Sequence, residues 1–210
     1  EAPATFTGKT RDRLESGSVV FGAGIDVRRP GRYRVAGRID DAAGKPLALA
    51  RFDVGFELEH NGKSVSALPP APTAEEQQRR LQRVMGRDFI EHAIRIDAQR
   101  GDLGLHGWVA EPRFNRAQAD RQFFFVNGRP VKDRLVIGAV RGAYMDFLAS
   151  DRHPMLCLFL DIPSDLVDVN VHPAKTEVRF QDSSLVRGLI VGALKHALAE
   201  AGHRASTSVA

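Results

Sequence analysis

One lysine near the C-terminus is displayed at a break in a strand pattern. The run VDVNVHPAKTEVRF, residues 167–180, alternates apolar and polar residues, is interrupted at Pro173 and resumes after Thr176. Lys175 is therefore predicted on the turn between two strands, where a rigid sheet can aim its ammonium group at an anion such as a phosphate. On the residues alone, an ordinary solvated loop lysine remains the alternative.

A second candidate cation follows a tight turn. Asn127-Gly128 ends an apolar strand predicted over residues 122–126, and Arg129 comes directly after the turn. A guanidinium in that position suits pairing with the phosphates of a nucleic-acid backbone, which gives affinity without sequence readout. Lys132 and Arg134 follow closely. A plain solvated turn residue remains the alternative for Arg129.

Basic residues also accumulate over a longer stretch and predict one basic surface around a loop, with a scattered solvated face as the alternative. The formal net charge is +4 and the pI is near 9.6, which permits a polyanionic partner without requiring one. The members of this predicted surface are Arg113, Arg116, Arg121, Arg129, Lys132 and Arg134.

Other reactive residue types are better explained by packing. Phe123, Phe124 and Phe125 offer a base-stacking platform, but alternation in a strand turns at least one of them inward, so core packing of most is favoured. His172 has no partner at metal-ligand spacing and is interpreted as structural. Cys157, the only cysteine, lies in an apolar run and is expected to be a buried core residue in a protein of the reducing cytoplasm.

Strands and helices alternate along most of the chain. A hairpin over residues 52–66 turns at Asn61-Gly62, and Thr73 with Glu76 forms a capping box for a helix that ends near Met85. The last helix is expected to be capped by Ser183 or Ser184 and to end near Gly202. Further strands are predicted at 94–96, 103–109, 122–126 and 156–162, and a further helix at 132–148.

The first 46 residues predict short strands at 18–21, 25–27 and 33–36, separated by glycine and proline, and they offer no residues to which chemistry can be assigned. No apolar stretch approaches the length of a membrane span, and the polar start does not resemble a signal peptide.

Four motifs together resemble the MutL family of DNA mismatch-repair proteins, over residues 47–210. They are VDVNVHPAKTEVRF at 167–180, QFFFVNGR at 122–129 with Asp133-Arg134, LGLHGWV at 103–109, and ALARFDV at 48–54 with HNGK at 60–63. The resemblance implies an α+β fold with a mixed sheet and packed helices, like domain 2 of ribosomal protein S5. It assigns residues 47–72 to the end of a GHKL ATPase domain and residues 73–210 to the transducer domain, and it leaves 1–46 as an unassigned, unrelated β-rich segment.

The same resemblance implies roles for the candidate cations. Lys175 would reach the γ-phosphate of ATP held by an ATPase domain, and Arg129, Lys132 and Arg134 would contact double-stranded DNA. Other mismatch-repair proteins are the implied protein partners, with no membrane. The family's nucleotide-binding motifs and C-terminal dimerisation region are not recognised in this sequence. No catalytic or metal-binding residue is therefore predicted, ATP and magnesium are expected only with a complete ATPase domain, and the chain alone is not expected to hydrolyse ATP.

Two rival interpretations remain at this stage. In the first, the chain is an interaction or structural module whose role is set by the N-terminal β-rich segment. In the second, it is a nucleic-acid-binding domain of the ribosomal S5 type without a role in repair, which rests on fold analogy alone. Affinity for duplex DNA with a steep salt dependence separates the repair module from a structural one.

Overall fold

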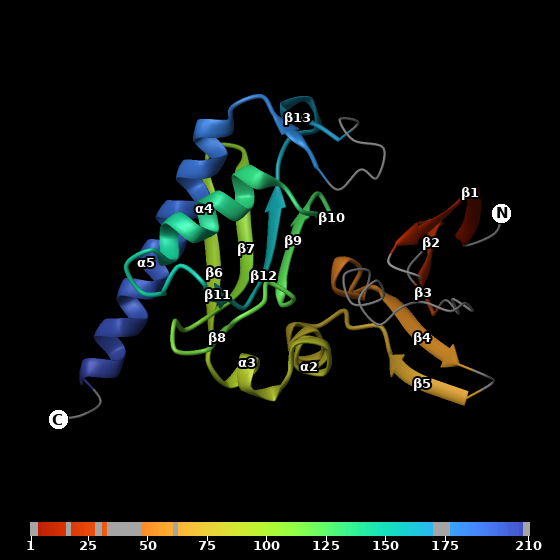
Figure 1. The fold of residues 1–210 in the computed structure, drawn as a ribbon, viewed down its shortest axis with the longest axis horizontal. Coiled ribbons are helices and arrows are strands. Elements are labelled where there is room, and N and C mark those ends of the chain that lie inside the picture. Colours follow the sequence, from red (N-terminus) through yellow and green to blue (C-terminus); the bar gives the residue numbers. More distant parts are fainter. Residues whose placement is uncertain are drawn as a thin grey trace. The chain divides into compact units, whose positions relative to one another are not determined.

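The structure, a computed structural model, describes residues 4–15, 18–27, 31–32, 48–60, 63–169 and 177–207. The chain forms two compact units, Glu1–Val84 and Met85–Ala210. Figure 1 shows the elements of both units.

The first unit is built mainly from two hairpins. Strands β1 (Ala4–Glu15) and β2 (Ser18–Val27) pair antiparallel, and β2 contains two of the predicted strands. Strand β4 (Val54–His60) pairs antiparallel with β5 (Lys63–Leu68) and parallel with the short β3 (Gly31–Arg32). The predicted hairpin is thereby confirmed, while its Asn61-Gly62 turn and the predicted strand 33–36 lie outside the described residues.

Helix α2 (Ala74–Met85) begins with the predicted capping box. The backbone N–H of Thr73 donates to Glu76 Oε2 at 3.0 Å, and the N–H of Glu76 donates to Thr73 Oγ1 at 3.3 Å, so two exposed donors of the first turn are satisfied reciprocally. Gly86, with φ of 101°, ends the helix.

A buried arginine anchors α2 within the first unit. Arg80 is 3% exposed, and burial lowers the pKa of its guanidinium while neighbouring Asp53 opposes that shift. Its guanidinium donates to four backbone carbonyls, those of Ala48, Arg51, Val54 and Pro69. The helix that follows the predicted linker therefore packs with the hairpin unit.

The second unit is a five-stranded mixed sheet with two long helices on one face (Figure 1). Strand order is β10-β9-β12-β7-β6, in which β12 runs parallel to β9 and every other neighbouring pair is antiparallel. The sheet strands are β6 (Ala93–Arg100), β7 (Leu103–Ala110), β9 (Gln122–Val126), β10 (Arg129–Val131) and β12 (Leu156–Asp161). The helices are α4 (Arg134–Tyr144) and α5 (Ser183–Thr207).

Short elements complete this unit at both ends of the sheet. They are α3 (Arg87–Glu91), the two-residue ladder of β8 (Asn115–Arg116) with β11 (His153–Pro154), the 3-10 helix η1 (Ser164–Leu166), and β13 (Val167–Asp168) paired with β14 (Arg179–Phe180). Together these elements confirm the mixed α+β fold predicted from the sequence.

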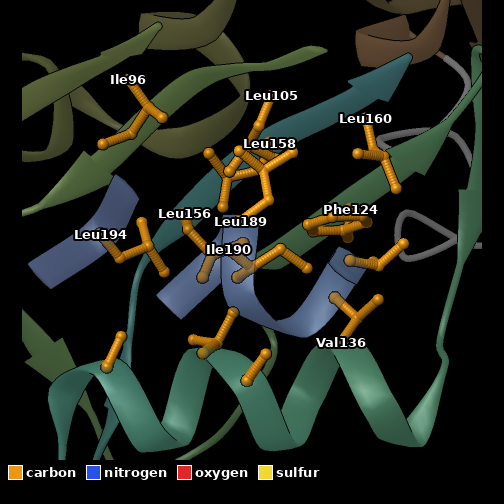
Figure 2. Close-up of a cluster of buried hydrophobic side chains, with 14 of the residues drawn as sticks. Ile96, Leu105, Phe124, Val136, Leu156, Leu158, Leu160, Leu189, Ile190 and Leu194 are labelled. Carbon is orange, nitrogen blue, oxygen red and sulfur yellow. The ribbon is translucent and has the colours of Figure 1, made fainter. Parts of the chain in front are cut away.

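The hydrophobic core lies between the sheet and the two helices, as Figure 2 shows. Leu156, Leu158 and Leu160 point from β12 toward Leu189 and Ile190 of α5, and all five are at most 5% exposed. Burying a side chain of this size stabilises the fold by about 1.5–3 kcal/mol. Alternation along β12 and helical spacing along α5 therefore meet in one apolar layer.

The other face of the sheet also buries aromatic residues. Phe123, Phe124 and Phe125 are 9%, 5% and 0% exposed, so the base-stacking platform is wrong and core packing is confirmed. Phe124 joins the helix-side core, whereas Phe125 stacks on Phe159 of β12 with ring centroids 4.8 Å apart. Cys157 is fully buried, as predicted.

Both predicted helices of the second unit form, with different bounds. Helix α4 begins at Arg134 and ends at Tyr144, inside the predicted 132–148. Helix α5 continues past Gly202 to Thr207, and its cap is Asp182, whose Oδ1 accepts from the N–H of Leu185 at 2.8 Å. The predicted serine cap is therefore wrong, because a carboxylate one residue earlier satisfies the same donor. Among the described helices, none has the length and apolar content of a membrane span.

Candidate functional site

The parallel strands β9 and β12 divide the basic residues between two ends of the sheet. Arg121 directly precedes β9, whereas Arg129 lies beyond its far end. Five strand residues between them span about 17 Å. We call Arg129, with Lys132 and Arg134 that follow it in the chain, the Arg129 end, and we call Arg113, Arg116 and Arg121 the Arg121 end. The structure thus separates Arg121 from Arg129, two members of the basic surface that was predicted around one loop.

The turn at the Arg129 end has the predicted hairpin geometry. Asn127 and Gly128 have φ of 48° and 73°, as a two-residue type I′ turn requires. The turn joins β9 to β10, where Arg129 lies opposite Val126 and Val131 lies opposite Phe124. Strand pairing on one side of the turn therefore sets the position of Arg129.

Hydrogen bonds fix the same turn to β12. The side-chain amide of Asn127 donates to the carbonyl of Ile162 at 2.8 Å and accepts from the N–H of Ile162 at 3.0 Å. The backbone N–H of Asn127 donates to the carbonyl of Leu160 at 3.0 Å. The sequence identified Asn127 as a turn residue only, and no local signal reveals a partner 35 positions away.

All three cations of the Arg129 end are exposed. Within the described part of the chain, none of their side chains makes a hydrogen bond or an ion pair with another residue. Val131, which is 6% exposed, anchors the segment between them in the core. A rigid backbone thus carries three cations whose charge no described carboxylate pairs.

Asp133 lies among these cations but serves the helix. It is 9% exposed and caps α4, accepting from the N–H groups of Leu135 at 2.8 Å and Val136 at 3.3 Å. Sequence reasoning missed this role, although an aspartate directly before a helical pattern is the usual signal for it. The start of α4 carries partial positive charge, and the Asp133 carboxylate is directed at that charge. The exposed surface of Arg129, Lys132 and Arg134 therefore remains cationic.

A hollow of about 790 Å³ lies beside the cap of α4. Its described lining includes Asp133, Asp165 and Asp168 together with one basic residue, Arg179. Across the described residues, no group of three or more His, Cys, Asp or Glu side chains is placed to hold a metal ion.

The Arg121 end has the opposite electrostatic character. Arg113 pairs with Glu111 at 2.7 Å, and Arg116 with Asp120 at 3.2 Å. The same Asp120 lies 3.8 Å from Arg121. Each end has three cationic side chains, but at this end each guanidinium already faces a carboxylate of its own chain.

Two buried groups of the second unit are chemically inert. Burial raises the pKa of the Cys157 thiol and of the Tyr144 hydroxyl, so both stay protonated at neutral pH. The Tyr144 hydroxyl donates to the carbonyl of Ala110 at 2.7 Å. Neither side chain is a candidate nucleophile.

The predicted strand pair around Lys175 is present at its flanks. Strands β13 and β14 pair antiparallel, with Val167 opposite Phe180 and Asp168 opposite Arg179. Lys175 and His172 lie between them, outside the described residues. Their roles therefore stay predictions from the sequence.

Comparison with known proteins identifies related sequences. Residues 81–199 match a family model described as DNA mismatch repair protein, C-terminal domain. The chain is 49% identical over 204 residues to the DNA mismatch repair protein MutL of Rhizorhabdus wittichii, covering 97% of this chain and 34% of that protein. With MutL of Caulobacter vibrioides the identity is 48% over 210 residues, covering 100% of this chain and 33% of that protein.

These alignments correct one expectation. Because the Caulobacter vibrioides alignment covers the whole chain, the first 46 residues align with the relatives as well, and the expectation of an unrelated N-terminal segment is wrong. The chain spans about a third of the length of these curated relatives. Its fold is similar to that in a crystal structure of the N-terminal domain of a DNA repair protein, with a TM-score of 0.61, 20% identity, and coverage of 76% of this chain and 52% of that one.

Proposed function

The chain belongs to the MutL family of DNA mismatch-repair proteins, and on that premise we propose that it binds double-stranded DNA nonspecifically through the Arg129 end. The observation that carries this proposal is the exposure of Arg129, Lys132 and Arg134 without a charged partner among the described residues. Free cations on a rigid backbone are what phosphate binding requires, since each phosphate that they neutralise releases counterions from the duplex.

The chemistry of this surface favours the DNA backbone over the bases. Arg129 follows a tight turn at the end of the sheet, and Arg134 is the first residue of a helix capped by its own Asp133. Neither placement presents a recognition helix to a groove. The phenylalanines of β9 are buried and supply no stacking platform. Affinity without sequence readout is the expected result.

A titration against duplex DNA tests the proposal directly. The chain, Arg129→Glu and Arg116→Glu are titrated against a fluorescent duplex of neutral sequence at several salt concentrations. Arg116→Glu is the matched control, since it makes the same charge change at the Arg121 end. We expect log affinity to fall linearly with log salt, Arg129→Glu to weaken binding about tenfold or more, and Arg116→Glu to do much less. No binding at low salt, or equal losses in both variants, contradicts the proposal.

A second role concerns nucleotide in the complete protein. We propose that Lys175 approaches the γ-phosphate of ATP held by an ATPase domain and senses its loss on hydrolysis. The support is the signature run around Lys175 and the β13–β14 pair on either side of it. Magnesium and the hydrolytic water belong to that other domain, and the chain alone is expected not to turn over ATP.

This second role is tested by ATP turnover. Full-length protein carrying Lys175→Ala should lose most of its turnover while the 210-residue chain shows none. If the chain itself hydrolyses ATP and Lys175→Ala abolishes that hydrolysis, the proposal that another domain supplies the hydrolytic site is contradicted. Other mismatch-repair proteins are the proposed protein partners, and the cytoplasm is the proposed location, in keeping with a single cysteine that is fully buried.

A further inference from the structure

Asn127 makes an unusual set of contacts for a turn residue. Its side-chain amide both donates to and accepts from the backbone of Ile162, and its own backbone N–H donates to Leu160. Ile162 directly follows β12, so the turn between β9 and β10 is fixed to the end of the neighbouring strand. The clamp joins chain segments 35 residues apart.

The strand after the turn adds limited support to that position. Strand β10 has three residues, lies at the edge of the five-stranded sheet and has β9 as its one neighbour among the described strands. Short edge strands open locally more readily than the centre of a sheet. Arg129 is the first residue of β10, so the placement of its guanidinium depends on whatever holds the turn.

Residue type matters at this position for two reasons. The φ of 48° lies in the left-handed region, where asparagine and glycine are favoured over most other residues. Both hydrogen bonds to Ile162 also require one donor and one acceptor on the same short side chain, which an amide supplies and a carboxylate does not. Glycine keeps the backbone conformation and the backbone bond to Leu160 but removes both side-chain bonds to Ile162, which makes it the informative substitution.

We propose that Asn127 is a positioning residue for DNA binding, acting through Arg129 by clamping the turn to β12 and not by touching DNA. This inference rests on the proposed function of the Arg129 end. It predicts that loss of the Asn127 side-chain hydrogen bonds weakens DNA binding only in chains that retain Arg129.

A double-mutant cycle separates positioning from a general structural effect. DNA affinity is measured at one low salt concentration for the chain, Asn127→Gly, Arg129→Ala and the double variant. We expect Asn127→Gly to weaken binding about fivefold in the parent chain, a typical coupling for neighbouring residues, and to change it less than about twofold in the Arg129→Ala background. Asn115→Gly is the matched control, since it removes an amide bonded to the Pro112 carbonyl at the Arg121 end, and should leave affinity unchanged.

The outcomes distinguish this inference from the function on which it rests. If Arg129→Ala leaves affinity unchanged, the proposed function fails. If Arg129→Ala weakens binding but Asn127→Gly has no effect, or an equal effect in both backgrounds, the positioning role is overturned and the DNA-binding proposal stands. Circular dichroism and thermal unfolding accompany each variant. Loss of folding in Asn127→Gly also overturns the inference, because Asn127 would then be needed for the fold and not for positioning.

Discussion

The two ends of the sheet carry three cationic side chains each, but only those of one end are paired with carboxylates. At the Arg121 end, Arg113, Arg116 and Arg121 each face a carboxylate of the same chain. At the Arg129 end, the three cations are exposed and make no ion pair within the described part of the chain. The number of arginines alone therefore does not show where an anion binds, because a carboxylate of the same chain competes with an external phosphate for each guanidinium.

Exposure alone does not separate the two ends either. The Arg113 side chain is 67% exposed and still paired to Glu111. Exposed pairs of this kind contribute little to stability, about 0–1 kcal/mol, but they neutralise the local field that attracts a polyanion. Arg121 and Arg129 are kept apart by the length of β9, whose two ends they flank.

The largest expected effect comes from breaking the sheet between the two ends. Gly107 of β7 has φ of 132°, and a Cβ there would collide with the backbone carbonyl of Cys157. We expect Gly107→Ala to destabilise the second unit by about 3 kcal/mol, measured by urea unfolding. Gly138→Ala in α4, where a Cβ meets nothing within 4 Å, is the control and should be neutral or stabilising. Equal losses in both variants would contradict this account of the sheet.

Removing all charge from the Arg129 end should change DNA binding next most strongly. In Arg129→Gln/Lys132→Gln/Arg134→Gln, we expect affinity to fall and the slope of log affinity against log salt to shrink by up to about 2.7, or 0.9 for each phosphate that the chain no longer neutralises. The measurement is the same salt titration. An unchanged slope would place the DNA-binding surface elsewhere on the chain.

Asp133→Asn should strengthen DNA binding at the Arg129 end, because it removes a negative charge there. Asparagine caps a helix nearly as well as aspartate, so stability should hold, while loss of the carboxylate leaves the three cations less opposed. We expect DNA affinity to rise about twofold at low salt, with the gain disappearing at high salt. Asp133→Ala serves as the control, since it also removes the cap and should cost about 1 kcal/mol of stability. A fall in affinity for Asp133→Asn would contradict a cationic surface at this end.

The smallest expected effect lies at the Arg121 end. The triple variant Arg113→Gln/Arg116→Gln/Arg121→Gln removes as much positive charge as the variant at the other end. We expect its salt slope to stay within about 0.5 of the parent value and its stability to change by less than about 1 kcal/mol, because the ion pairs it removes are exposed and already neutralised. A slope change equal to that of the Arg129-end variant would remove the distinction between the two ends.

The sequence predicted much of the fold wherever the signal is local. The Asn127-Gly128 turn, the Thr73–Glu76 capping box and the apolar run of β12 all depend on residues a few positions apart. The cap preference predicted the wrong residue for α5, because two neighbouring residues can both cap a helix and Asp182 does so in place of the adjacent serine. The roles predicted for Lys175 and Arg129 stay predictions.

By itself, the sequence determined the family, the longer strands and helices beyond residue 52, the tight turn before Arg129 and the burial of Cys157. Only the tertiary structure decided which arginines are paired, that Asn127 clamps Ile162, and that Arg80 binds four carbonyls around α2. Periodicity, caps and turns are set by hydrogen bonds and sterics within a few residues. Ion pairs and clamps join groups far apart in the chain, which meet only after the sheet has formed and excluded water from its core.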